Sequence, residues 1–193
     1  IDNESNSNIS QNSENYLLHN FKKEIKKSNM VILSDYNKGV INKRIATTII
    51  EYCNSKMIPI IVDPKNRDFS IFKGATIATP NKKEASEISS MPSDTDKEIE
   101  LCAKFISKKY KIKNLLITRG EKGLSYINSK TIIHLQTKAK EVYDVSGAGD
   151  TILSLFTAAY SCNLDLKESL HLANVSAGIV VGKIGTAITS FNE

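Results

Sequence analysis

Short apolar runs alternate with helical patterns along most of this chain, and this alternation limits the folds that it can adopt. Four five-residue runs have the composition of buried strands. They lie at residues 30–34, 58–62, 75–79 and 114–118, and amphipathic helical patterns lie between them, for example at about 42–55 and 93–110. Strands that alternate with helices form a parallel sheet covered on both faces. We therefore expect a three-layer α/β fold.

The C-terminal part of the chain departs from this alternation. Residues 123–127 and 131–135 are two further strand-like runs, joined by a three-residue polar turn. This pattern predicts an antiparallel hairpin at one edge of the sheet. Two apolar helical patterns follow, at about 148–161 and 166–181.

The N-terminal part is different in composition. Residues 1–13 are polar and rich in Asn and Ser, which indicates a loop or tail, and residues 14–27 have the spacing of one amphipathic helix. We therefore expect two parts: a tail with one helix at 1–29, and the main α/β portion at 30–193.

The composition is that of an ordinary globular protein with a basic balance. The net charge is +5, yet Arg44, Arg67 and Arg119 are the only arginines among 26 basic residues. Nucleic-acid sites favour arginine, so we expect no nucleic-acid partner. The lysines are compatible with an anionic small-molecule ligand and equally with a solvated surface. No apolar run is long enough to cross a bilayer, so we expect no membrane partner.

Three cysteines lie far apart, at Cys53, Cys102 and Cys162, and no CxxC pair occurs. Cys102 and Cys162 fall within apolar helical patterns, which predicts buried free thiols. Free thiols persist in a reducing compartment, and we expect a cytoplasmic protein.

Polar clusters follow the predicted strands. They lie at 35–39, 63–67, 81–84, 119–123 and 144–150. In sheets of this kind, ligands bind beyond the carboxyl ends of the strands. We therefore expect these clusters to converge on one site.

The most specific of these clusters is the run DVSGAGD at residues 144–150, which leads into an apolar helical pattern. Gly147, Ala148 and Gly149 are poor residues for capping a helix, so the first N–H groups of that helix are available to a ligand. Together with the helix dipole they favour an anion such as phosphate. A carboxylate at Asp150, next to that anion, is electrostatically unfavourable unless it accepts a proton or binds a metal ion. The run predicts phosphoryl transfer, with an ordinary acidic helix start as the alternative.

The cluster at residues 79–84, TPNKKE, permits two interpretations. Asn81 and Glu84 have the spacing of a capping box at a helix start. The same two side chains are suited to organising a hydrated magnesium ion. The run Gly120–Gly123 follows a predicted strand but leads into another strand, and by itself it indicates a plain tight turn.

Taken together, these motifs resemble those of the ribokinase-like carbohydrate kinases of the phosphofructokinase-B type. DVSGAGD is similar to that family's signature, and TPNKKE is similar to its Asn-x-x-Glu motif. The chain also resembles, more narrowly, the D-glycero-β-D-manno-heptose 7-phosphate kinases of lipopolysaccharide core synthesis. That resemblance lies in residues 33–40, 62–84, 115–125, 141–151 and 172–186, which follow the family's order and cover nearly all of the chain from residue 30 onward.

The resemblance implies roles for the residues of the DVSGAGD run. Asp150 is implied as the general base that takes the proton from the anomeric hydroxyl of a sugar phosphate. The N–H groups of Gly147, Ala148 and Gly149 are implied as an anion hole for the developing charge.

The resemblance also implies ATP and Mg²⁺ as cofactors. Glu84 with Asn81 is implied to organise water-bound magnesium, and Thr118 and Gly120 to form the nucleotide-binding turn. The remaining implied contacts are those of Asn174 and Gly185 around the adenine, and of Lys38 and Lys65 with phosphates. The alternatives are a structural hydrogen bond to a neighbouring loop for Asn174 and a solvated surface charge for either lysine.

Finally, the resemblance implies what is absent before Met30. In this family the N-terminal part supplies the first strands, most sugar contacts and a small β lid. We therefore expect an ATP-dependent sugar-phosphate kinase with an incomplete acceptor pocket, which a homodimer or a complementing N-terminal segment would complete. Two alternatives stay open: a kinase for another sugar, ribose- or fructose-like, and a non-catalytic nucleotide-binding fragment.

Overall fold

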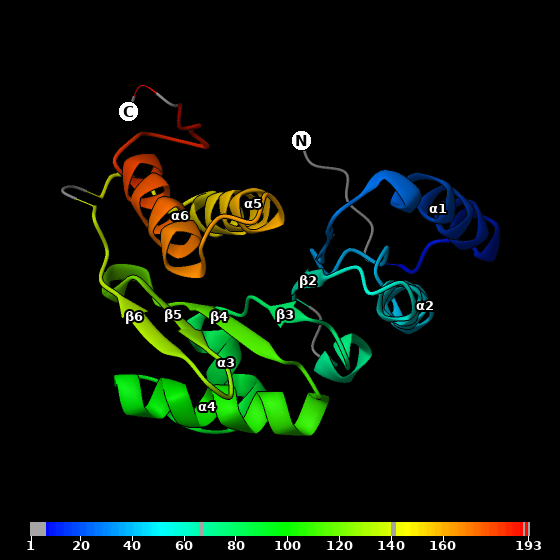
Figure 1. The fold of residues 1–193 in the computed structure, drawn as a ribbon, viewed down its shortest axis with the longest axis horizontal. Helices are drawn as coiled ribbons and strands as arrows, with labels where there is room; N and C mark the ends of the chain where they lie inside the picture. The colour runs from blue at the N-terminus through cyan, green and yellow to red at the C-terminus, as the bar shows by residue number, and fades with distance from the viewer. Residues whose placement is uncertain (1–6, 66–67, 140–141, 191, 193) are drawn as a thin grey trace.

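Six strands form one mixed sheet in a computed structural model that describes residues 7–65, 68–139, 142–190 and 192. The strand order is β1-β2-β3-β4-β5-β6 (Figure 1). The strands are β1 (Val31–Ser34), β2 (Ile60–Asp63), β3 (Ile77–Ala78), β4 (Asn114–Thr118), β5 (Leu124–Ile127) and β6 (Ile132–Leu135). The first four pair in parallel, and β4, β5 and β6 pair antiparallel. The parallel sheet and the edge hairpin predicted from the sequence are both confirmed.

Helices cover both faces of the sheet. They are α1 (Gln11–Glu24), α2 (Lys43–Ser55), α3 (Lys82–Ser89), α4 (Asp96–Tyr110), α5 (Ala148–Ser161) and α6 (Leu166–Val181), with short 3₁₀ turns η1 (Ile25–Lys27), η2 (Phe69–Phe72) and η3 (Gly120–Lys122). Figure 1 shows α5 and α6 together on one face, with α3 and α4 on the other.

Successive side chains along a strand point to opposite faces of the sheet. Ile60 and Val62 of β2 belong to a core shared with α1 to α4, whereas Ile61 between them belongs to a core shared with α5 and α6. This alternation is the period of two expected of a strand, and it explains why the runs are apolar throughout.

Helix α1 begins earlier than the sequence pattern indicated. The side chain of Ser10 accepts a hydrogen bond from the N–H of Ser13, which caps the helix so that residues 11–13, predicted as tail, are helical. Leu18 and Ile25 are buried in the main core. Helix α1 therefore packs on the sheet portion.

Polar contacts fasten α1 to α2. The carboxylate of Glu14 accepts hydrogen bonds from Asn42 Nδ2 and Arg44 Nη1, each at 2.5 Å. These donors lower the pKa of Glu14, with Arg44 the larger influence. Asn42 in turn caps α2, because its Oδ1 accepts from the N–H of Ile45 at 3.1 Å.

Two smaller expectations are corrected by the structure. The third strand is only Ile77–Ala78, because the chain turns toward α3 at once. Cys102 is buried as predicted, but Cys162 is exposed, since it lies at the C-terminal cap of α5 where the apolar face of the helix has ended. Among the described residues, no helix has both the length and the apolar character needed to cross a bilayer.

Candidate active site

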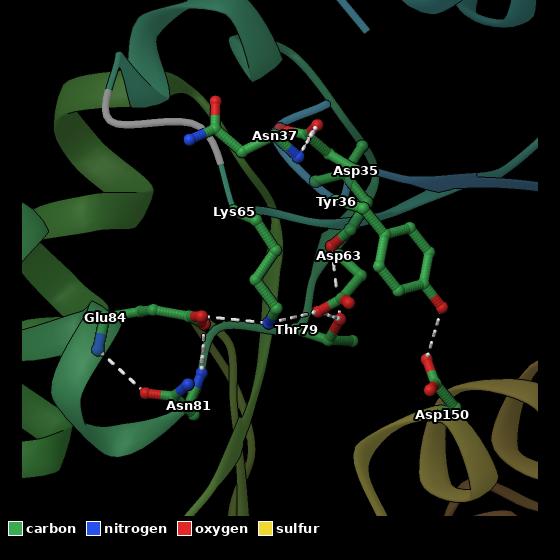
Figure 2. Close-up of polar contacts among 10 residues, drawn as sticks. Asp35, Tyr36, Asn37, Asp63, Lys65, Thr79, Asn81, Glu84 and Asp150 are labelled. Carbon is green, nitrogen blue, oxygen red and sulfur yellow. Dashed lines mark hydrogen bonds and ion pairs between the residues drawn. The ribbon is translucent and has the colours of Figure 1, made fainter. Parts of the chain in front are cut away.

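The ends of the parallel strands bring the predicted polar clusters together. The N–H of Asp35 donates to the carbonyl of Asp63 at 3.1 Å, which joins the loops after β1 and β2. The N–H of Thr79 donates to the carbonyl of Val62, and that of Thr118 to the carbonyl of Pro80, at 2.9 and 3.3 Å. Parallel register therefore places four loops at one edge of the sheet, and Figure 2 shows residues of those that follow β1, β2 and β3.

Lys65 lies between two carboxylates at this edge. Its Nζ is 2.8 Å from Oε1 of Glu84 and 3.4 Å from Oδ1 of Asp63 (Figure 2). Burial raises the pKa of Asp63, although the Lys65 charge opposes this. Burial alone would lower the pKa of Lys65, but Glu84 and Asp63 more than offset it and raise that pKa. Lys65 is thus held as an ammonium ion within the site.

The capping box predicted for Asn81 and Glu84 is present. The Oδ1 of Asn81 accepts from the N–H of Glu84 at 2.9 Å, and Oε2 of Glu84 accepts from the N–H of Asn81 at 2.7 Å. Glu84 therefore uses one oxygen for the cap and the other for Lys65. Its carboxylate is fixed in direction at the start of α3.

The start of α5 has the open backbone that the DVSGAGD run predicted. Gly147 has a φ of +79°, and a Cβ added there would meet nothing within 4 Å. No side chain of the described residues caps the helix. The N–H of Ala148 donates to the carbonyl of Val145 at 3.3 Å, so that group already has a partner in this conformation. Gly149 is exposed and also has space around it.

Asp150 is exposed in the first turn of α5, where it meets a residue that the sequence analysis did not select. The hydroxyl of Tyr36 donates to Oδ1 of Asp150 at 3.3 Å (Figure 2). Tyr36 lies in the polar cluster after β1, in which Lys38 is the only predicted site residue. The one feature of the sequence that indicates Tyr36 is its position directly after a predicted strand.

Asp35 is a second residue that sequence reasoning missed. It is 1% exposed, and its Oδ1 accepts from the N–H of Asn37 at 2.8 Å. Its Oδ2 is buried and has no hydrogen-bond partner in the part of the chain that the structure describes. Burial of a carboxylate oxygen without a hydrogen-bond partner carries a desolvation cost that the described residues do not offset.

A buried polar network supports the turn that contains Thr118 and Gly120. The side chain of Arg119 is 3% exposed, with Nη2 at 2.6 Å from Oδ1 of Asp96 and Nη1 at 3.0 Å from the hydroxyl of Ser125. That hydroxyl also contacts Nδ1 of His134 at 2.8 Å. The turn is therefore anchored to α4, β5 and β6, although its sequence indicated only a tight turn.

Other predicted residues lie at different places. Asn174 is buried in α6 and its Nδ2 donates to the carbonyl of Gln136 at 2.7 Å, which is the structural alternative foreseen for it. Gly185 lies after α6 with a φ of +75°, and Lys38 is exposed. A hollow of about 420 Å³ lies at the opposite end of β4, lined by Asn114, Lys130 and neighbouring residues, and it contains none of the predicted site residues.

Comparison with known proteins identifies the family of this chain. A family model described as pfkB family carbohydrate kinase matches residues 2–192. The chain belongs to the pfkB family of carbohydrate kinases. The ribokinase-like fold and the kinase class expected from the motifs are thereby confirmed.

Among curated proteins, the chain is similar to relatives named bifunctional protein HldE. The relative from Geotalea uraniireducens is 40% identical over 194 residues, which cover 100% of this chain and 40% of the relative. The relative from Aliarcobacter butzleri is 38% identical over 192 residues, again covering 100% of this chain and 40% of the relative. The chain thus spans about two fifths of the length of these relatives.

Solved structures of the pfkB kind share the fold. Phosphofructokinase-2 from Escherichia coli, in complex with potassium, superimposes with a TM-score of 0.82 at 18% identity, covering 96% of this chain and 60% of that one. A ribokinase from Arabidopsis thaliana, complexed with ribose and ATP, gives a TM-score of 0.73 at 22% identity, covering 93% and 55%.

The strand ends carry oxygen donors of the kind that suits a magnesium ion. Asp63 and Glu84 supply carboxylates, the ligand type that Mg²⁺ prefers. Within the described ranges, no three His, Cys, Asp or Glu side chains are grouped closely enough to hold a metal ion by themselves. Such residues suit a hydrated ion that is also bound by nucleotide phosphates, since Mg²⁺ usually keeps several waters.

Proposed function

We propose that this chain carries the ATP-binding and proton-accepting part of a sugar-phosphate kinase. One observation carries the proposal: Asp150 lies at the uncapped start of α5, on the same edge of the sheet as the Asp63, Lys65 and Glu84 cluster (Figure 2). A phosphoryl group transferred across that edge would have a cation on one side and a base on the other.

In the proposed reaction, Asp150 takes the proton of the acceptor hydroxyl while the oxygen of that hydroxyl attacks the γ-phosphorus of ATP. The bond from that phosphorus to the bridging oxygen breaks, and ADP leaves. Open space beside Gly147 and Gly149 would let backbone N–H groups face the transferred phosphoryl without a side chain in the way. The local conformation needs glycine at 147, because its φ is positive.

Lys65, Asn81 and Glu84 would serve the ATP phosphates. The ammonium of Lys65 would turn from the carboxylates toward a phosphate, and Glu84 with Asn81 would hold hydrated magnesium, with the Asp63 carboxylate beside them. When bound, that ion neutralises charge on the β- and γ-phosphates. The capping box keeps Glu84 in place while its partner changes.

The proposed acceptor is D-glycero-β-D-manno-heptose 7-phosphate, phosphorylated at its anomeric hydroxyl to the 1,7-bisphosphate, a step of ADP-heptose and lipopolysaccharide core synthesis. Support comes from the motif resemblance and from about 40% identity to HldE relatives over the whole chain. A kinase for another sugar is the second candidate, because phosphofructokinase-2 and ribokinase share the fold. The third is a nucleotide-binding fragment without turnover.

The proposed partners are a second copy of the chain or a complementing N-terminal segment. Strand β1 is at the edge of the sheet, and its Ile32 is 41% exposed. An apolar edge strand is a site where another strand can pair.

The test measures ADP release with Mg-ATP and heptose 7-phosphate, fructose 6-phosphate or ribose. It compares the chain alone with the chain supplied with the N-terminal segment of an HldE relative. Turnover confined to the heptose phosphate is the expected result. Turnover only with another sugar would favour the second candidate, and ATP binding without turnover in either form would favour the third. Asp150→Asn should bind ATP normally while its turnover falls about 10²-fold or more.

A further inference from the structure

We propose that Tyr36 is a positioning residue for Asp150. From the loop after β1, its hydroxyl orients the Asp150 carboxylate by a hydrogen bond. The proposal rests on the function proposed above for Asp150. It assigns a task to the loop after β1, which the motif resemblance linked only to Lys38.

The contact joins two segments that are 114 residues apart. The hydroxyl of Tyr36 donates to Oδ1 of Asp150 at 3.3 Å. Figure 2 shows the ring of Tyr36 reaching from the β1 loop toward the first turn of α5. Within the described part of the chain, this is the hydrogen bond that the Asp150 carboxylate accepts. Its other oxygen, Oδ2, therefore stays available to an acceptor hydroxyl.

The backbone on both sides of Tyr36 is held firmly. Asp35 before it is buried and donates its N–H to the carbonyl of Asp63 at 3.1 Å. Asn37 after it donates its N–H to Oδ1 of Asp35 at 2.8 Å and has a φ of +53°. With the backbone restrained, two side-chain torsions remain to direct the hydroxyl of Tyr36.

The N-terminal segment restrains the far end of the same loop. The N–H of Ile9 donates to the carbonyl of Gly39 at 3.2 Å. A Cβ at Gly39 would lie 2.0 Å from the carbonyl oxygen of Ser7, so this approach requires glycine. Both ends of the loop are thus restrained by hydrogen bonds, and Tyr36 lies between them with 61% of its surface exposed.

An exposed hydrogen bond of this length contributes little to stability, so its value lies in orientation. A base must present one oxygen to the proton that it takes, and misplacement lowers the rate steeply. By occupying Oδ1, the hydroxyl of Tyr36 selects the orientation in which Oδ2 faces the acceptor.

The first experiment is kinetic and uses the form of the protein with the highest turnover in the assay above. In Tyr36→Phe, kcat should fall about tenfold while KM for ATP and the melting temperature stay unchanged. Tyr16→Phe is the matched control, because Tyr16 is 71% exposed on α1, away from the site, and should behave as wild type. In an Asp150→Asn background, Tyr36→Phe should cause no further loss.

The outcomes separate the two proposals. If Asp150→Asn keeps full turnover, the role proposed for Asp150 fails. If Asp150→Asn abolishes turnover and Tyr36→Phe equals wild type, the role proposed for Tyr36 is overturned.

A second measurement needs no turnover. The ¹³C resonance of Tyr36 Cζ, which senses hydrogen bonding of the phenol, should shift in Asp150→Ala, which removes the acceptor, and stay in place in Glu121→Ala, which removes a carboxylate outside the contact. An identical Cζ shift in wild type and Asp150→Ala would overturn the proposal.

Discussion

Lys65 and Glu84 form an ion pair across the loops that follow β2 and β3, with Nζ 2.8 Å from Oε1. The same Glu84 carboxylate closes the capping box of α3, so one residue links a helix start, a lysine and, through that lysine, Asp63. A carboxylate and an ammonium ion that hold each other in this way are ready to exchange partners when an anion and a cation arrive together, as they do in Mg-ATP.

Replacing Lys65 should therefore affect ligand binding more than folding. In Lys65→Met, the Kd for Mg-ATP should rise about tenfold, because a charge-assisted phosphate contact is lost. The free energy of unfolding should change by less than about 1 kcal/mol, since the pair is partly exposed. Titration calorimetry and urea unfolding measure the two quantities. Lys83→Met on α3, where the pair to Glu87 is 4.0 Å long, is the control and should change neither quantity.

The Oδ2 of Asp35, which has no hydrogen-bond partner among the described residues, leads to the prediction of a variant with increased stability. Asp35→Asn keeps the acceptor for the N–H of Asn37 but removes a buried charge. We expect the variant to be more stable than wild type by about 1 kcal/mol, read from urea unfolding. A clear loss of stability would show that Oδ2 has a partner in solution, and the interpretation of this strand end would then be wrong.

The buried guanidinium of Arg119 should be needed for the stability of the turn at Thr118 and Gly120. Arg119→Met leaves the buried hydroxyl of Ser125 with one partner fewer and cuts the tie to Asp96. We expect a loss of about 1–3 kcal/mol in the free energy of unfolding. Lys122→Met removes an exposed contact to the carbonyl of Asp94 and should cost little by comparison. Equal losses in the two variants would contradict the structural importance of the network.

The hydrogen bonds that Glu14 of α1 accepts from Asn42 and Arg44 should make the stability of the protein depend on pH in the acid range. The pKa of Glu14 is lowered from 4.5 in the folded chain, first by the Arg44 hydrogen bond and then by Asn42. A carboxyl of this kind contributes stability above its unfolded pKa, and the contribution is lost as the pH falls through the folded value. The difference in melting temperature between wild type and Glu14→Gln should therefore be present at neutral pH and shrink progressively as the pH falls below 4.5. A difference that persists unchanged in acid would exclude the ionic contribution.

Local patterns were sufficient for most of the fold. Apolar runs of five residues and helical spacing depend on neighbours in the chain, and they located the six strands and the main helices to within a few residues. They failed where a local cap or turn decides the boundary, as at Ser10 before α1 and at the end of the short strand β3. The uncapped start of α5 was predictable too, because Gly147 lacks a side chain whatever the tertiary structure.

For the candidate site, too, some features were predictable from the sequence and others were not. The sequence by itself determined that Asp150, Asn81 and Glu84 follow strand or loop ends, and hence that they belong to one edge of a parallel sheet. Only the tertiary structure decided that Tyr36 meets Asp150, that Lys65 pairs with Glu84, and that Asn174 bonds a loop. Such contacts depend on how α5 and α6 pack over the strands and on the direction in which each loop leaves the sheet. Spacing along the chain carries no information about either, because the free energy that selects them comes from packing between segments up to 114 residues apart.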